Sequence, residues 1–304
     1  MSKSLDRITL LETFVRIADA GSISAAARDL GLSQPSASRQ LSELENRLKA
    51  QLMRRNTHSL ALTDAGRELL ADARQILDSW DALEEKHLSA ETNVQGKLKV
   101  VAPVALGQQY LVRIACDFQA HNPGVSLTWE LDDQPIKFAE AGCDCWIRVG
   151  PVPDETLIVR RIGSVDRVLV ASKAFIKRSG LPDTPKAAER LPLVALDPFE
   201  GGRVPLSRNR RRVEINPPVC MRTNNIYAMK EATRSGLGMA VLPTWFISDE
   251  LKRGALIDVM PGWKAPVLDL HLAYLPGRHQ PLRLRAFIDF LENSITGLAG
   301  IKAA

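Results

Sequence analysis

The start of the chain shows apolar positions at helical spacing. Residues 10–18 carry one apolar stripe, which Gly21 ends as a C-terminal glycine does. An alanine-rich segment at 25–30 follows and stops at Gly31. Because alanine side chains are small, neighbouring helices can approach closely here. The pattern predicts two helices joined by a glycine turn.

A third helix is predicted directly after that turn. Ser33 caps it, and Pro35 falls in its first turn, where the missing N–H costs little. Its apolar face consists of Ala37, Leu41, Leu44 and Leu48. Its first residues are short and polar and project outward. This is the helix-turn-helix arrangement, whose second helix can enter a DNA major groove.

Residues 52–63 predict a small β-wing. Arg54, Arg55 and His58 lie between two apolar patches, at 52–53 and 60–62. The wing would add a second contact to that of the helix.

A long helix is predicted next, with Thr63 as its cap and Asp64 in its first turn. Its apolar positions recur alternately three and four residues apart: Leu69, Ala73, Ile76, Trp80, Leu83 and His87. This heptad seam favours a partner helix from a second subunit. An intrachain connector is the alternative. The periodicity is lost over 90–96, so we expect a hinge that ends at Gly96.

From Lys97 onward, short strands alternate with helices. Strands are predicted at 98–102, 125–131, 145–149, 167–171, 193–196, 219–222, 239–242 and 269–274. Helices are predicted at 106–120, 225–235 and 282–291, with another between 242 and 269. Repeated βα units predict a doubly wound α/β sheet.

Composition limits the class of protein. The chain has 304 residues, of which 45% are hydrophobic and 25% charged, so we expect a folded protein of two or three domains. No apolar run approaches the ~18 residues that span a membrane. Residues 1–7 are charged and unlike a signal peptide, so we expect a cytoplasmic protein.

The net charge of +5 is unevenly distributed. Residues 1–63 carry +3, residues 64–95 carry −5 and residues 96–304 carry +7. Because the charge of the first segment is modest, contacts to base edges would have to supplement electrostatic attraction to DNA.

The four cysteines do not form a disulfide framework in a cytoplasmic protein. Cys143 and Cys145 have no His or further Cys near enough to complete a zinc site, and in a strand both would point to one face. We expect buried, reduced thiols without a metal; a redox role is the alternative.

Several stretches together resemble the LysR-type transcriptional regulators over essentially the whole chain. They are LLETFVRIADAG (10–21), SAAARDLGLSQPSASRQL (24–41), LTDAGRELL (62–70), GKLKVVAPVALG (96–107), CWIRVG (145–150), SGLGMAVLP (235–243) and RAFIDFL (285–291). The resemblance implies a winged helix-turn-helix at 1–63, a dimerising linker helix and hinge at 64–95, and a two-lobed effector-binding domain at 96–304. That domain would resemble periplasmic binding proteins. Lobe I would comprise about 96–162 and 268–304, and lobe II about 163–267.

The resemblance also carries over the family's DNA contacts. They would fall on Ser33, Gln34, Pro35, Ser36, Ser38 and Arg39 of the recognition helix and on Arg54, Arg55 and His58 of the wing. Gln34 can pair with adenine and Arg39 with guanine or phosphate. Ser33 can equally be an N-cap alone. His58 stands where the family often has arginine, which weakens the wing's expected grip.

The family binds its effector in the cleft between the lobes. The corresponding candidates here are Pro103, Val104, Ala105, Asp132, Asp133, Phe199, Asn224 and Asn225. If Asp132 and Asp133 face the cleft, they favour a cationic or polyhydroxyl effector; a solvated acidic turn is the alternative. The asparagine pair can also simply cap a helix.

We therefore expect a sequence-specific transcriptional regulator, and not an enzyme. It would act as a homodimer or homotetramer with double-stranded DNA, a small-molecule effector and RNA polymerase as partners, and without a cofactor. The sequence carries no serine-hydrolase, metalloprotease or phosphate-loop motif. Two competing hypotheses are a pure solute-binding protein and an architectural DNA-binding protein. The basic run Arg208, Arg210, Arg211 and Arg212 favours a solvated loop over a nucleic-acid contact.

Overall fold

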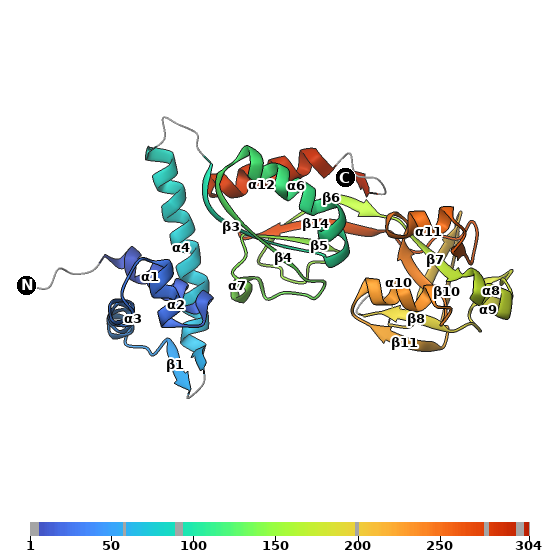
Figure 1. Cartoon of the computed structure of the whole chain (residues 1–304), viewed down its shortest axis with the longest axis horizontal. Coiled ribbons are helices and arrows are strands. Elements are labelled where there is room, and N and C mark those ends of the chain that lie inside the picture. The colour runs from blue at the N-terminus through green and yellow to red at the C-terminus, as the bar shows by residue number, and fades with distance from the viewer. Residues whose placement is uncertain are drawn as a thin grey trace, which may run out of the picture.

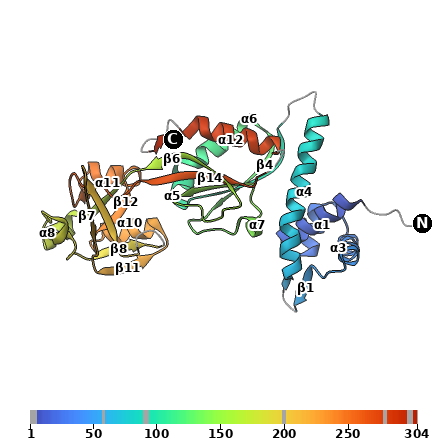
Figure 2. The same ribbon diagram turned by 180° about the vertical axis from the view of Figure 1, so that it is seen from behind.

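The computed structural model describes residues 6–56, 59–88, 94–197, 201–276, 280–295 and 301–303. The chain forms a helical head with a wing, a long helix beside it, and two α/β lobes that follow one another (Figures 1 and 2). In the described part, no helix combines the length and apolar character needed to cross a membrane.

The head contains α1 (Arg7–Ala20), α2 (Ile23–Asp29) and α3 (Gln34–Leu48). Gly21 ends α1 in the left-handed conformation, at φ 58°, as predicted. The three helices pack around a buried cluster that includes Phe14, Ala26 and Leu41. The prediction for Leu48 is wrong, because its side chain is 46% exposed. It lies in the last turn of α3, after which the chain turns away at Lys49.

The wing is the antiparallel hairpin of β1 (Met53–Asn56) and β2 (Ser59–Leu62), as predicted. Thr63 then caps α4 (Asp64–Leu88), because its hydroxyl oxygen accepts a hydrogen bond from Gly66 N at 2.9 Å. A Cβ atom on Gly66 would lie 2.1 Å from the backbone oxygen of Leu52. Only glycine therefore lets the wing's base pack this closely on α4.

The apolar seam of α4 is divided between two environments. Ala73 is fully buried in the head's own cluster, and Leu69 packs partly against it. The prediction that Ala73 meets a partner helix is therefore wrong. Further along α4, Ile76, Trp80 and Leu83 are 46%, 40% and 43% exposed. The side chain of His87 lies outside the described part of the helix.

Lobe I is built on one mixed sheet in the order β15-β6-β14-β5-β3-β4. The strands β3 (Gln95–Ala102), β4 (Gly124–Leu131) and β5 (Cys145–Val149) are parallel. The strands β14 (Leu268–Tyr274), β6 (Ile158–Val165) and β15 (Ile301–Ala303) complete it through antiparallel pairs. Gly96 lies inside β3, so the expected hinge does not end there. Residues 89–93 of that hinge lie outside the described residues.

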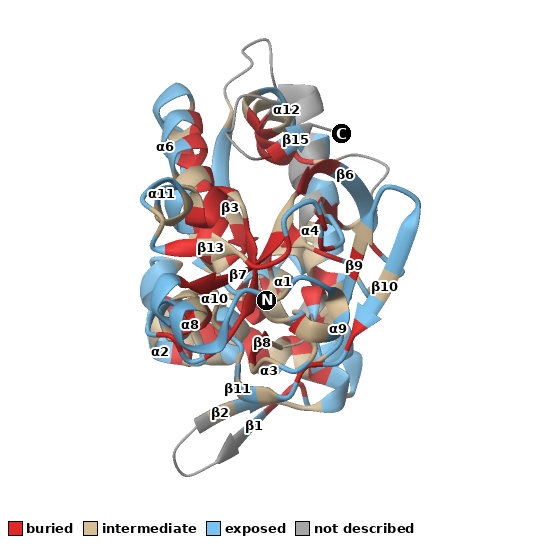
Figure 3. Ribbon diagram, turned by 90° about the vertical axis from the view of Figure 1, so that its right-hand side faces the viewer, coloured by how far each residue is buried: buried red, intermediate tan, exposed pale blue. Residues whose placement is uncertain are grey.

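Helices cover both faces of this sheet. One face carries α5 (Val104–Leu106), the π-helix η1 (Gly107–Leu111), α6 (Val112–His121) and α12 (Leu282–Ile295), and the short α7 (Phe138–Ala141) lies on the other (Figure 1). Alternation along β3 explains this: Leu98 and Val100 join one buried cluster, while Val101 joins a second cluster with Phe138. Buried residues accordingly run along the strands of both lobes (Figure 3).

Lobe II is made of smaller sheets. Its strands are β7 (Arg167–Ser172), β8 (Leu193–Leu196), β9 (Val204–Arg208), β10 (Arg211–Ile215), β11 (Val219–Thr223), β12 (Ala240–Pro243) and β13 (Leu256–Asp258). Its helices are α8 (Lys173–Ser179), α9 (Pro185–Ala188), α10 (Ile226–Arg234), the 3-10 helix η2 (Trp245–Ile247) and α11 (Ser248–Lys252). The basic run belongs to the β9–β10 hairpin and is not a simple loop. Its arginines are exposed, as expected.

The chain crosses between the lobes twice. The first crossing joins β6 to β7 at residues 165–167, and the second leads from 266 into β14. Arg167 Nε donates a hydrogen bond to the Pro266 backbone oxygen at 2.9 Å. The two crossing segments are therefore tied to each other.

The cysteines remain free thiols. Cys143 and Cys145 are buried, but they do not share a face of the sheet as predicted. Cys143 precedes β5 and packs beside Phe138, whereas Cys145 belongs to the cluster on the opposite face. Burial raises the pKa of Cys143 to about 12 and that of Cys145 well above its usual value. The described residues contain no group of three side chains suited to a metal ion.

Candidate functional site

The N-terminus of α3 is exposed and offers the polar side chains expected of a recognition helix. Gln34, Pro35 and Arg39 are exposed, and Ser36 and Ser38 are half-buried. Ser33 is also exposed, but it caps the helix: its hydroxyl accepts from Ser36 N at 3.3 Å and lies 2.8 Å from the Ser36 hydroxyl oxygen. The positive end of the helix dipole at this terminus suits phosphate oxygens.

The opposite face of α3 explains why these residues point outward. Ala37 and Leu41 are buried, and Gln40 accepts a hydrogen bond from the Thr13 hydroxyl of α1. This contact fixes the rotation of α3 against the rest of the head. Gln34 and Arg39 therefore stay accessible to a base edge.

The wing is attached to the same helix. Glu45 of α3 accepts backbone hydrogen bonds from Leu52 N at 2.8 Å and Met53 N at 3.2 Å, immediately before the first wing strand and at its start. Arg54 is exposed on β1. The side chain of Arg55 is outside the described part of the strand, and His58 lies outside the described residues.

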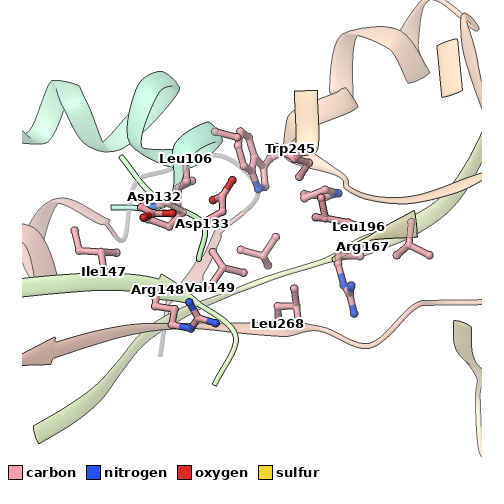
Figure 4. Close-up of a pocket in the computed structure, with 16 residues that line it drawn as sticks. Leu106, Asp132, Asp133, Ile147, Arg148, Val149, Arg167, Leu196, Trp245 and Leu268 are labelled. Carbon is pink, nitrogen blue, oxygen red and sulfur yellow. The ribbon is translucent and has the colours of Figure 1, made fainter. Parts of the chain in front are cut away.

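A second candidate site is a cavity between the two lobes. About 70 Å³ of it is accessible to the centres of water-sized molecules, within a total empty space of about 710 Å³ that includes open solvent. Its walls come from both lobes and from both crossing segments, and most of the lining side chains are apolar (Figure 4). A mostly apolar cavity with a few polar groups, at a junction of two lobes, is typical of a small-molecule site.

The structure brings some of the predicted effector residues to this cavity and not others. Pro103, Ala105, Asp132 and Asp133 line it. Val104, Asn224 and Asn225 do not, and Phe199 lies outside the described residues. Val104 instead donates its backbone N–H to Asp133, and Asn225 caps α10 by accepting from Tyr227 N and Ala228 N. The capping alternative for Asn225 is therefore the correct one.

The acidic turn after β4 faces the cavity. Asp133 is half-buried, and its Oδ1 accepts the Val104 N–H at 2.9 Å. Burial raises the pKa of Asp133, and the hydrogen bond from Val104 opposes that shift. Asp132 is exposed at the cavity's edge and accepts from Gln134 N at 2.8 Å.

A buried arginine faces the same cavity. Arg148 is only 6% exposed; its Nε donates to the Pro151 oxygen at 2.7 Å, and its guanidinium carbon lies 4.9 Å from the Trp146 ring centroid. Burial lowers the pKa of Arg148, and the charges of Asp133 and Asp132 act in the opposite direction. Arg167 also lines the cavity, at the first crossing segment.

Trp245 contributes a hydrogen-bond donor without a partner. Its indole Nε1 is buried and makes no hydrogen bond to any described residue. Trp245 lines the cavity, with its indole nitrogen directed inward (Figure 4). An unpaired buried donor costs free energy.

Sequence reasoning missed Arg148, Arg167 and Trp245. One local signal for Arg148 exists: it is the single charged residue in the otherwise apolar strand CWIRV. A charge there needs a partner or an aqueous cavity. For Trp245 no comparable signal is present.

Comparisons with known proteins agree with this arrangement. Residues 8–67 match the bacterial regulatory helix-turn-helix proteins of the lysR family, and residues 91–295 match the LysR substrate binding domain. The chain is 28% identical over 299 residues to a probable HTH-type transcriptional regulator, LtrA, of Klebsiella pneumoniae, with 97% of both chains covered.

Solved structures show the same fold. A full-length OxyR variant from Pseudomonas aeruginosa superposes with a TM-score of 0.74 at 16% identity, covering 98% of this chain and 97% of that one. ArgP from Mycobacterium tuberculosis gives 0.69 at 20% identity, covering 97% and 99%. With an exposed recognition helix, a wing and a two-lobed domain that match along nearly its whole length, the chain belongs to the LysR family and is a LysR-type transcriptional regulator with a substrate-binding domain.

Proposed function

We propose that this regulator binds specific DNA sequences through α3 and the wing, and that a small molecule in the cavity between the lobes controls that binding. The observation that carries the proposal is the position of the cavity. Its walls include Val165, Arg167 and Leu268 of the crossing segments. An occupant there contacts both lobes and can favour one relative orientation over another.

The DNA-binding unit is residues 1–63, with Gln34 and Arg39 as base-reading candidates. Pro35, Ser36, Ser38, Arg54, Arg55 and His58 would add contacts to phosphate or to the groove. Ser33 acts through the cap it forms. Residues 64–95 link this unit to the effector-binding unit, 96–304.

The dimer would form through α4. Ile76, Trp80 and Leu83 lie at heptad spacing on α4 and are exposed to solvent. Two heads held this way would fit a pseudo-palindromic site on one face of DNA. As a regulator of transcription the protein would work in the cytoplasm, at the chromosome, with RNA polymerase as a further partner.

The test is selection of genomic DNA fragments by the purified full-length protein in the presence of competitor DNA. A short motif with dyad symmetry is expected. The same selection is repeated with Arg39→Ala, which should bind the motif more weakly. Arg211→Gln, on the exposed β9–β10 hairpin, is its control and should recover the same motif. Recovery of fragments without a shared motif would contradict specific binding and favour an architectural role.

A further inference from the structure

The cavity is lined by side chains of opposite charge. Asp132 and Asp133 lie on one side, and Arg148 and Arg167 on the other (Figure 4). No ion pair within 4.0 Å joins Asp133 to Arg148 in the described structure. The lining therefore offers groups of both signs, carboxylates and guanidinium groups, to an occupant.

Asp133 and Arg148 are each held in place by other groups. Asp133 is fixed through Oδ1 by the Val104 N–H. Arg148 is fixed through Nε by the Pro151 oxygen and by stacking on Trp146. Its two terminal nitrogens, Nη1 and Nη2, make no hydrogen bond to any described residue. The charged ends are thus preorganised and available to an occupant.

Burying a guanidinium and a carboxylate without an ion pair for either is costly. A carboxylate in the cavity can pair with Arg148 in a fork geometry, and an ammonium group can pair with Asp133. A molecule with only one of these charges would leave the other protein charge unpaired. It would also place its own charge near a like charge of the lining.

The rest of the wall sets the character of the occupant's body. Leu106, Ile147 and Val149 present apolar surface to the cavity. The occupant's middle should therefore be apolar.

We propose that the effector is a small zwitterion with an apolar body, whose ammonium group binds Asp133 and whose carboxylate binds Arg148. This inference rests on the proposed effector function and narrows it to one ligand class. It differs from the expectation drawn from Asp132 and Asp133 alone, because Arg148 supplies the site for an anion.

The test uses the intact protein and isothermal titration calorimetry with matched series of probes. One series comprises leucine, N-acetylleucine, which lacks the ammonium charge, and leucinamide, which lacks the carboxylate. Phenylalanine and 6-aminohexanoate, with the corresponding singly charged derivatives, vary the body and the charge separation. We expect at least one zwitterion to bind tenfold or more tightly than both of its singly charged derivatives.

Two variants test which side chain of the protein binds each charged group of the ligand. In Asp133→Asn the preference for the zwitterion over its ammonium-free derivative should disappear. In Arg148→Gln the preference over its carboxylate-free derivative should disappear. Glu214→Gln and Arg211→Gln, exposed on the β9–β10 hairpin, are the matched controls and should keep both preferences. If a cavity variant does not fold, the wild-type series decides alone.

The inference is overturned if singly charged probes bind as tightly as the zwitterions, if no zwitterion binds, or if folded variants of both residues keep both preferences. The proposed function has a separate readout, DNA binding. A singly charged probe that binds the cavity and changes affinity for the selected motif would leave effector control intact and reject the zwitterion. A zwitterion that binds through Asp133 and Arg148 without changing DNA affinity would support the ligand class and reject effector control of DNA binding.

Discussion

Gly66 holds the wing against the long helix, and replacing it with alanine should loosen the head. The added Cβ would lie 2.1 Å from Leu52 O and 3.0 Å from Leu52 C. Real contacts of this kind stay near 3 Å, so the backbone oxygen must move by about 1 Å. The same oxygen accepts hydrogen bonds from Thr63 N at 3.0 Å and from the Thr63 hydroxyl at 3.2 Å.

These contacts give the expected loss in the free energy of unfolding of the head in Gly66→Ala. Overpacking costs about 1–3 kcal/mol. Weakening one of the two hydrogen bonds costs about 1 kcal/mol more. Alanine's higher helix propensity returns about 1 kcal/mol. The net loss is therefore about 1–3 kcal/mol, and since about 1.4 kcal/mol is a factor of ten, amides of the head should exchange roughly five- to 150-fold faster.

Hydrogen exchange measured by mass spectrometry on the intact protein is the assay. Peptides from α1 and α3 should exchange faster in Gly66→Ala, while peptides from the two lobes should not change. Glu68→Ala is the control, because Glu68 is exposed on the same helix. Unchanged protection of α1 and α3 would refute the close approach of α4 to the wing.

Further predictions concern the dimer, the DNA contact and the thiols. Trp80→Glu should convert dimers to monomers in sedimentation velocity, because each 40% exposed Trp80 would lose roughly 2–3 kcal/mol of burial at the interface; an unchanged profile would rule out this seam. Arg39→Ala should weaken binding to the selected motif by about 1–3 kcal/mol in fluorescence anisotropy, and an unchanged Kd would remove Arg39 from the contacts. Cys116 should react with iodoacetamide in the folded protein at pH 7, whereas Cys143, with its pKa raised to about 12, and buried Cys145 should react only after unfolding. Mass spectrometry reads this directly, and early labelling of Cys143 would contradict its burial.

Local signals make the head predictable from sequence. Gly21 and Ser33 act through backbone geometry within a few residues, so helix ends can be placed without knowledge of the fold. The seam of α4 is harder to interpret. Heptad spacing identifies an apolar face, but it does not tell whether that face packs on the same head, as Ala73 does, or remains exposed, as Trp80 does.

Strands that contain several charged residues are not predicted from the sequence. In β6 the first four residues, which include Arg160 and Arg161, are exposed and the last four are buried, so the alternation that predicts a strand is absent. The arginine-rich β9–β10 hairpin has the sequence pattern of a loop for a similar reason.

The cavity requires tertiary structure. Asp133 follows β4 and Arg148 lies on β5, and these strands are separated in the sheet by β3. No spacing along the chain indicates that the two side chains share a cavity. Sequence reasoning therefore finds the carboxylates but assigns the site the wrong balance of charge.

The hydrogen bond between Arg167 and Pro266 has a mechanical consequence. Two independent tethers would let the lobes twist, slide and bend separately, whereas a hydrogen bond between the tethers opposes motions that pull them apart. Opening and closing of the lobes is the motion that this contact opposes least. Under the proposed effector control, agonists and antagonists of similar affinity would therefore differ in the angle at which they hold the lobes.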